Sequence, residues 1–147
     1  MRVLFVCTGN SCRSPMAELY FNDLCRRAGR TDLEALSAGT CAWDGAVISN
    51  PAAAVLAEYG IESRDFHSRH LTPALADRCD LIVAMTAGHR EDIAEIAPAA
   101  TQKIRLLLDY DRGGDVPDPY GGSVEHYRQV FQTMRPALER LAAALLK

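Results

Sequence analysis

The hydrophobic pattern of the chain begins with a continuous apolar run at residues 3–6, which ends at Cys7 and a polar loop. A second run, at residues 80–85, is the longest candidate for a central strand. Runs without polar alternation are typical of strands buried on both faces, as in the parallel sheets of α/β proteins. Shorter runs at residues 33–37 and 104–108 provide two further strand candidates.

Between these runs, apolar residues recur at intervals of three and four, the period of a helix with one buried face. Prolines suited to a first helical turn and glycines suited to a C-terminus bound several of the segments. The expected helices run from Pro15 to Gly29, from Asn50-Pro51 to Gly60, from Thr72-Pro73, from Thr86 to before Pro98, and from Ser123 to the end of the chain. Pro136 lies within the last of these and predicts a kink or break.

Strands that alternate with helices predict an α/β fold in which a four-stranded parallel sheet carries helices on both faces. A chain of 147 residues without repeats or a low-complexity linker suits one domain, residues 1–147. In such sheets ligands bind beyond the carboxyl ends of the strands. The sequence therefore predicts a single-domain three-layer sandwich with an anion-binding loop directly after the first strand.

Composition narrows the possible partners. The formal charge of -3 and the absence of a Lys/Arg block give no electrostatic basis for binding nucleic acid or an anionic membrane. No secretion signal precedes the first strand, and no apolar stretch approaches the ~20 residues that span a bilayer. The five cysteines and four histidines form neither a Cys-x-x-Cys pair nor a ligand cluster. We expect a cytoplasmic protein with reduced thiols that needs no metal or other cofactor.

The loop after the first strand combines an anion site with a nucleophile. Its backbone amides and the start of the following helix can surround a tetrahedral oxyanion. The loop lacks the lysine of a nucleotide-binding phosphate loop and places the Cys7 thiol where the anion would lie. Arg13 and the helix terminus favour the reactive thiolate, to which Ser14 can donate a hydrogen bond. A buried strand-end cysteine is the alternative for Cys7, and the offsets of Arg13 and Ser14 argue against it.

The segment from Cys7 to Pro15, Cys-Thr-Gly-Asn-Ser-Cys-Arg-Ser-Pro, resembles the signature of the low-molecular-weight protein tyrosine phosphatases. In that signature a cysteine, five residues, an arginine and a serine or threonine stand at the extreme N-terminus. The resemblance covers essentially the whole chain. It includes Ser37-Ala38-Gly39, the Trp43 loop before Asn50-Pro51, His67, Ala84-Met85-Thr86 and Asp118-Pro119-Tyr120.

The resemblance implies that Cys7 attacks phosphorus and forms a phosphocysteine intermediate while Arg13 clamps the phosphoryl oxygens. Asp118 would protonate the leaving group and then activate water. Its neighbour Pro119 restricts it to an extended geometry, which favours Asp118 over other aspartates for this role. Asp109, Asp111 and Asp115 are its competitors for this role. The residues implied in phosphate binding and loop support are Thr8, Gly9, Asn10, Ser11, Cys12, Ser14, Ser37 and His67. Among them, Asn10 would hold the strained loop, with Ser37 and His67 as its expected partners.

The substrate depends on side chains around the loop. Trp43 and Tyr120 are expected as aromatic walls and favour the aryl ester of phosphotyrosine. Ser11 stands where many phosphotyrosine-specific members carry a bulky apolar residue, and Gly121 stands where eukaryotic members carry a second aromatic residue. The chain also resembles the bacterial protein arginine phosphatases, which have threonine and phenylalanine in place of Ser11 and Tyr120. Phosphorylated proteins or peptides are the expected partners of a monomer or weak homodimer, and phosphoarginine remains the alternative substrate.

Two rival functions follow from the same loop. Thiol-dependent arsenate reductases resemble it closely, but their chemistry needs two further cysteines after the third strand, and residues 85–96 contain none. A phosphate-binding module without catalysis would not need Asp118. Cys12 has two interpretations: a partner of Cys7 in a reversible protective disulfide, as in the family, or a small residue that packs within the loop.

Overall fold

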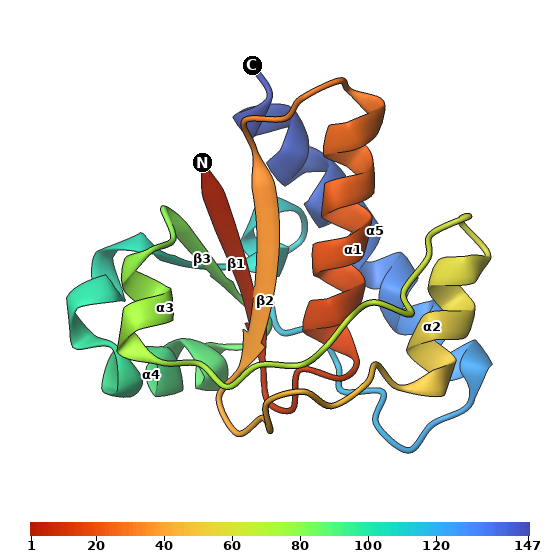
Figure 1. Ribbon diagram of the computed structural model, residues 1–147, viewed down its shortest axis with the longest axis horizontal. Coiled ribbons are helices and arrows are strands. Elements are labelled where there is room, and N and C mark those ends of the chain that lie inside the picture. Colours follow the sequence, from red (N-terminus) through yellow and green to blue (C-terminus); the bar gives the residue numbers. More distant parts are fainter.

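The computed structural model describes residues 1–147 and contains one four-stranded sheet with the strand order β2-β1-β3-β4 (Figure 1). All three strand pairs are parallel. The strands are β1 (Arg2–Cys7), β2 (Glu34–Gly39), β3 (Leu81–Ala84) and β4 (Ile104–Leu106). The predicted fold class is confirmed, and β1 lies in the middle of the sheet with its carboxyl end at Cys7.

Helices cover both faces of the sheet (Figure 1). They are α1 (Arg13–Arg27), α2 (Asn50–Ala57), α3 (Pro73–Asp77), α4 (Ala87–Ile96) and α5 (Val124–Leu145), with 3-10 turns η1 (Pro98–Lys103) and η2 (Leu107–Tyr110). On one face α1 and α5 pack together with α2 beside them, and α3 and α4 lie on the other face (Figure 1). No helix combines the length and the apolar character needed to cross a membrane.

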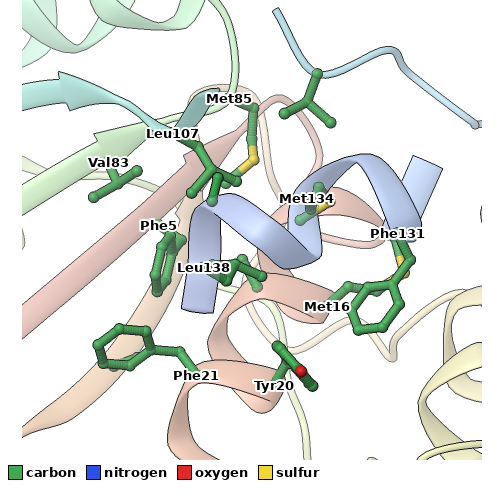
Figure 2. Close-up of a cluster of buried hydrophobic side chains, with 14 of the residues drawn as sticks. Phe5, Met16, Tyr20, Phe21, Val83, Met85, Leu107, Phe131, Met134 and Leu138 are labelled. Atoms are coloured by element: carbon green, nitrogen blue, oxygen red, sulfur yellow. The ribbon is translucent and has the colours of Figure 1, made fainter. Parts of the chain in front are cut away.

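Alternate side chains of β1 enter two separate cores. Val3 and Phe5 join the larger core beneath α1 and α5, whereas Leu4 and Val6 join the smaller core beneath α3 and α4. Figure 2 shows Phe5 in the larger core, which Met134 and Leu138 of α5 also enter. Since all four of these β1 side chains are fully buried, the strand is held from both sides. The position of its last residue, Cys7, is therefore set by a strand that packs against a buried core on each face.

The helix boundaries agree with the sequence patterns in most places. Side-chain oxygens of Thr72, Thr86 and Ser123 accept the backbone N–H three residues later, at 3.1 to 3.2 Å, and so cap α3, α4 and α5. Gly29 and Gly60 follow α1 and α2 with φ of 71° and 72°, the left-handed conformation of a helix stop.

Other boundaries differ from the prediction. Of the kink or break predicted at Pro136, the break does not occur, because α5 runs unbroken through this residue. Buried side chains on both sides, such as Met134 and Leu138, outweigh one lost backbone hydrogen bond. The Asn50-Pro51 pair predicts Asn50 as the cap of this helix, but α2 begins at Asn50 and Ser49 takes the cap position. The fourth strand ends at Leu106, because the chain turns into η2 there.

Candidate active site

The loop between β1 and α1 is tied to the segment that follows β2. The N–H groups of Thr40 and Cys41 donate to the carbonyl oxygens of Cys7 and Thr8 at 3.0 and 2.9 Å. Gly39 makes this approach possible, because a Cβ atom there would lie 2.4 Å from the Thr8 carbonyl oxygen and 2.9 Å from the Asn10 nitrogen. A glycine at this strand end is therefore a requirement of the loop.

Asn10 holds the loop from inside. It is fully buried and has a φ of 52°, a left-handed conformation that asparagine tolerates better than most residues. Its Nδ2 donates to the hydroxyl oxygens of Ser14 and Ser37 at 2.8 and 2.9 Å. Its Oδ1 accepts the backbone N–H of Arg69 at 2.9 Å. The structure thus brings Asn10, Ser14 and Ser37 together.

His67 does not take part in this network, so its predicted place beside Asn10 is wrong. Its ring is exposed, and Nδ1 lies 3.2 Å from the carbonyl oxygen of Asp65. Phe66 and Ser68 on either side are buried, and the alternation of an extended segment turns the side chain between them outward.

Ser14 links the loop to the cysteine. Its hydroxyl oxygen lies 2.9 Å from the Cys7 sulfur and accepts a hydrogen bond from Asn10. The hydroxyl hydrogen of Ser14 has two acceptors within reach, the Cys7 sulfur at 2.9 Å and the Ala38 carbonyl oxygen at 3.4 Å, and the sulfur is the nearer. One residue further along the network, Ser37 donates to Glu18 Oε1 at 2.7 Å, and burial raises the pKa of the Glu18 carboxyl. Glu18 is absent from the predicted site, because a lone helical glutamate carries no signal in the sequence.

Arg13 joins the loop to the segment before α5. The residue is 5% exposed, and its Nη1 donates to the Val116 carbonyl oxygen at 3.0 Å. Its Nη2 lies 3.7 Å from Asp118 Oδ2. The other oxygen of Asp118 accepts the N–H of Tyr120 at 3.0 Å, a local turn that orients the carboxylate.

The rival aspartates have other partners or positions. Asp115 accepts the N–H of Ala87 at the start of α4 at 2.9 Å, and Asp111 pairs with Arg140 at 3.0 Å. Asp109 is exposed within η2. Among the four candidates, Asp118 is the one that lines the pocket containing the Cys7 sulfur.

This pocket has a volume of about 240 Å³ and is open to solvent. Its walls are Cys7, Thr8, Gly9, Ser11, Cys12, Arg13, Asp118 and Tyr120. Tyr120 is 79% exposed and so forms part of the rim. Trp43 is 83% exposed and outside the lining, so its prediction as a wall is wrong for this conformation. The Ser68 hydroxyl donates a hydrogen bond to the backbone carbonyl oxygen of Trp43, which fixes the loop but leaves the indole in solvent.

Cys12 lies between the pocket and α5. Its sulfur is 3.1 Å from the Tyr127 hydroxyl and 3.6 Å from the Ser49 hydroxyl. Burial is the main cause that raises the pKa of Tyr127 to about 12, so this phenol stays protonated at neutral pH. Neither Ser49 nor Tyr127 is prominent in the sequence, because each resembles an ordinary cap or core residue.

The fold and the site together define a class of protein. A cysteine at the carboxyl end of a central parallel strand, a loop that leads into a helix N-terminus, a buried arginine and a nearby carboxylate are the components of a cysteine-dependent phosphatase.

Comparison with known proteins agrees with this class. The family model for low molecular weight phosphotyrosine protein phosphatase matches residues 2–147. The chain belongs to that family. A low molecular weight protein-tyrosine-phosphatase from Streptomyces coelicolor is 41% identical, with 98% of this chain and 93% of the relative covered. A protein-arginine-phosphatase from Geobacillus stearothermophilus is 39% identical, with 98% and 95% covered.

A solved structure of YwlE arginine phosphatase, a C7S mutant with a phosphorylated active site serine, superimposes with a TM-score of 0.93. It is 37% identical, and the match covers 100% of this chain and 97% of that one. Relatives of both named activities thus share the fold and the length of this chain. The enzyme class is therefore a cysteine-dependent phosphatase.

Proposed function

We propose that the protein hydrolyses phosphotyrosine in phosphorylated proteins or peptides, with Cys7 as nucleophile, Arg13 as phosphate clamp and Asp118 as general acid and base. The observation that carries this proposal is that Cys7, Arg13 and Asp118 line the same pocket. Within it, Arg13 Nη2 lies 3.7 Å from Asp118 Oδ2. A carboxyl group near the mouth of an anion site serves catalysis and would weaken simple phosphate binding.

In the first step the Cys7 thiolate attacks phosphorus, and a P–S bond forms as the P–O bond to the leaving group breaks. The Ser14 hydroxyl, 2.9 Å from the sulfur, supports the thiolate before attack and after its release. Arg13 and the loop amides hold the phosphoryl oxygens as they gain charge. Protonated Asp118 donates its proton to the leaving phenolate oxygen.

In the second step the Asp118 carboxylate takes a proton from a water molecule, whose oxygen attacks the phosphocysteine. The P–S bond breaks, inorganic phosphate leaves, and the Cys7 thiolate is restored. Asp118 returns to its protonated form, so the cycle balances without a metal or another cofactor.

Tyr120 supports an aryl substrate. Its ring stands at the rim, and its backbone N–H fixes Asp118, so one short turn places both an aromatic surface and the acid. Ser11 supports the second candidate, phosphoarginine. Its half-buried side chain lines the pocket, where a hydroxyl group leaves more room than a branched apolar residue and can bond with a P–N leaving group. Relatives named protein-arginine-phosphatase strengthen this alternative.

The decisive experiment compares kcat/KM for matched phosphotyrosine and phosphoarginine peptides. We expect the phosphotyrosine peptide to be the better substrate and Tyr120→Ala to raise its KM. Trp43→Ala is the matched control, since it removes an equally exposed aromatic residue outside the pocket. A clear preference for phosphoarginine, with both aromatic variants unchanged, would establish the second candidate. Ser11→Ile should lower phosphoarginine turnover more than phosphotyrosine turnover, and no change in either would remove Ser11 as the selector.

We also infer a cytoplasmic location and a single catalytic domain over residues 1–147. All five cysteines are free in the structure, as suits a reducing compartment. The acidic net charge of -3 argues against nucleic acid or anionic membranes as partners. A monomer or weak homodimer is the state to test by analytical ultracentrifugation over a range of concentrations.

A further inference from the structure

His89 is a buried histidine between the pocket wall and α4. It is 5% exposed and lies in the first turn of α4, outside the pocket lining. Its Nε2 is 2.8 Å from the Thr8 hydroxyl oxygen, and its Nδ1 is 3.0 Å from the Thr86 hydroxyl oxygen. Thr8 in turn lines the pocket next to Cys7. A hydrogen-bonded chain therefore runs from the cap of α4 to the substrate pocket.

The partners of Thr86 indicate where the hydrogens of this chain lie. Thr86 Oγ1 accepts the backbone N–H of His89 at 3.1 Å as the cap of α4. Its own hydroxyl hydrogen has an acceptor when Nδ1 of His89 is unprotonated. The ring hydrogen then lies on Nε2 and is donated to the oxygen of Thr8. In the opposite tautomer, the Thr86 hydroxyl hydrogen finds no acceptor within the chain.

The charges around His89 favour the neutral ring. Burial is the main cause that lowers its pKa to about 4, and the Arg13 guanidinium acts in the same direction. The carboxylates of Asp92, Asp115 and Asp118 oppose this shift and are outweighed. At neutral pH the imidazole therefore has one donor and one acceptor, as the two threonines require.

We propose that His89 is a positioning residue that orients the Thr8 hydroxyl as a hydrogen-bond donor to an oxygen of the phosphorylated substrate. Because the Nε2–H group of His89 donates to the Thr8 hydroxyl oxygen, the hydroxyl hydrogen of Thr8 points away from His89 and into the pocket. Thr8 touches the substrate, and His89 acts only through Thr8. The inference deepens the proposed function and rests on it for the identity of the substrate.

A double-mutant cycle tests the coupling. Thr8→Val keeps the shape of the side chain and removes its hydroxyl, and His89→Phe keeps a ring without hydrogen-bonding atoms. Each single variant should lower kcat/KM for p-nitrophenyl phosphate, or weaken binding of inorganic phosphate, by about tenfold, the effect of one hydrogen bond to a charged group. The double variant should lose no more than about tenfold, because both changes remove the same interaction.

Two conservative variants separate this role from a purely structural one. Thr8→Ser keeps the hydroxyl and should recover most of the kcat/KM that Thr8→Val loses. His89→Gln should recover most of the activity lost in His89→Phe, because its amide nitrogen can donate to Thr8. Where His89→Phe fails to fold, the Thr8→Val and Thr8→Ser pair still tests the donor role of the Thr8 hydroxyl, and without that role the inference falls.

Two results would overturn the inference. One is Thr8→Val with wild-type kcat/KM and wild-type phosphate affinity. The other is a double variant with a loss of about a hundredfold, which would mean independent effects. Failure of the proposed function is a separate result: the wild-type protein would then hydrolyse no aryl phosphate. In that case the same cycle, measured as the Kd of inorganic phosphate by titration calorimetry, still tests the coupling of His89 to Thr8.

Discussion

Replacing Asn10 by alanine should destabilise the protein and slow catalysis, because Asn10 holds the loop at three points. The substitution removes both hydrogen bonds from Nδ2, to Ser14 and Ser37, and the one that Oδ1 accepts from Arg69. It also places alanine, whose Cβ disfavours the left-handed region, at a φ of 52°. The perturbation therefore combines lost hydrogen bonds with backbone strain.

The magnitude follows from these two parts. Each of the three hydrogen bonds, two of them buried and the one from Arg69 part-buried, contributes about 1 kcal/mol net. Alanine in the left-handed region costs about 1 kcal/mol more. The free energy of unfolding should therefore fall by roughly 4 kcal/mol, out of the about 5–15 kcal/mol typical of a domain. Since Ser14 meets the Cys7 sulfur, kcat should fall as well.

Urea denaturation and steady-state kinetics on p-nitrophenyl phosphate measure the two effects. Asn10→Gly is the matched control, because it removes the same hydrogen bonds without the strain and should be about 1 kcal/mol more stable than Asn10→Ala. Asn10→Asp keeps the acceptor for Arg69 and should fall between the wild-type protein and Asn10→Gly. If Asn10→Ala matches the wild-type protein in both stability and kcat, the loop is not held by this side chain.

Three further predictions concern other parts of the site. Asp118→Asn keeps the acceptor for the Tyr120 N–H but cannot transfer the proton; kcat for a phosphotyrosine peptide should fall by about 10²–10⁴, and an unchanged kcat would rule out Asp118 as the acid. Gly39→Ala should lower Tm and kcat together, with a loss of about 1–3 kcal/mol in stability, because its Cβ would meet the Thr8 carbonyl; calorimetry showing an unchanged Tm would contradict this. His89 has a folded-state pKa of about 4 against 6.5 when unfolded, so the unfolded state binds the extra proton in this window and stability falls as pH falls from 6.5 towards 4. Urea titrations across that window should show a loss of roughly 3 kcal/mol that is smaller in His89→Gln, and parallel curves for the two proteins would refute the assignment.

The elements of the fold were predictable because their signals are local. A buried parallel strand reads as an apolar run, and caps such as Thr86 and Ser123 stand next to the helices they start. The unbroken α5 was not predictable, because the penalty of Pro136 is local whereas the packing that offsets it comes from α1 and η2. For the same reason the end of β4 at Leu106 could not be located from its apolar run.

The site divides in a similar way. Cys7, Arg13 and Ser14 are close in sequence, so their spacing alone predicts a shared loop. Asp118 was predicted from its neighbours Pro119 and Tyr120, although it is distant along the chain. Residues that support the loop from other elements were harder to assign, as the outward turn of His67 and the exposed Trp43 illustrate.

By itself, the sequence determined the α/β architecture and the phosphatase class, and it predicted the anion loop after the first strand with the proposed nucleophile, clamp and acid. These depend on short-range patterns that one segment carries within itself. Only the tertiary structure decided which distant side chains hold the loop: Arg69 and not His67 meets Asn10, Glu18 meets Ser37, and His89 meets Thr8. The physical reason is that a hydrogen bond between two elements depends on how their faces pack, and the local sequence of neither element predicts that orientation.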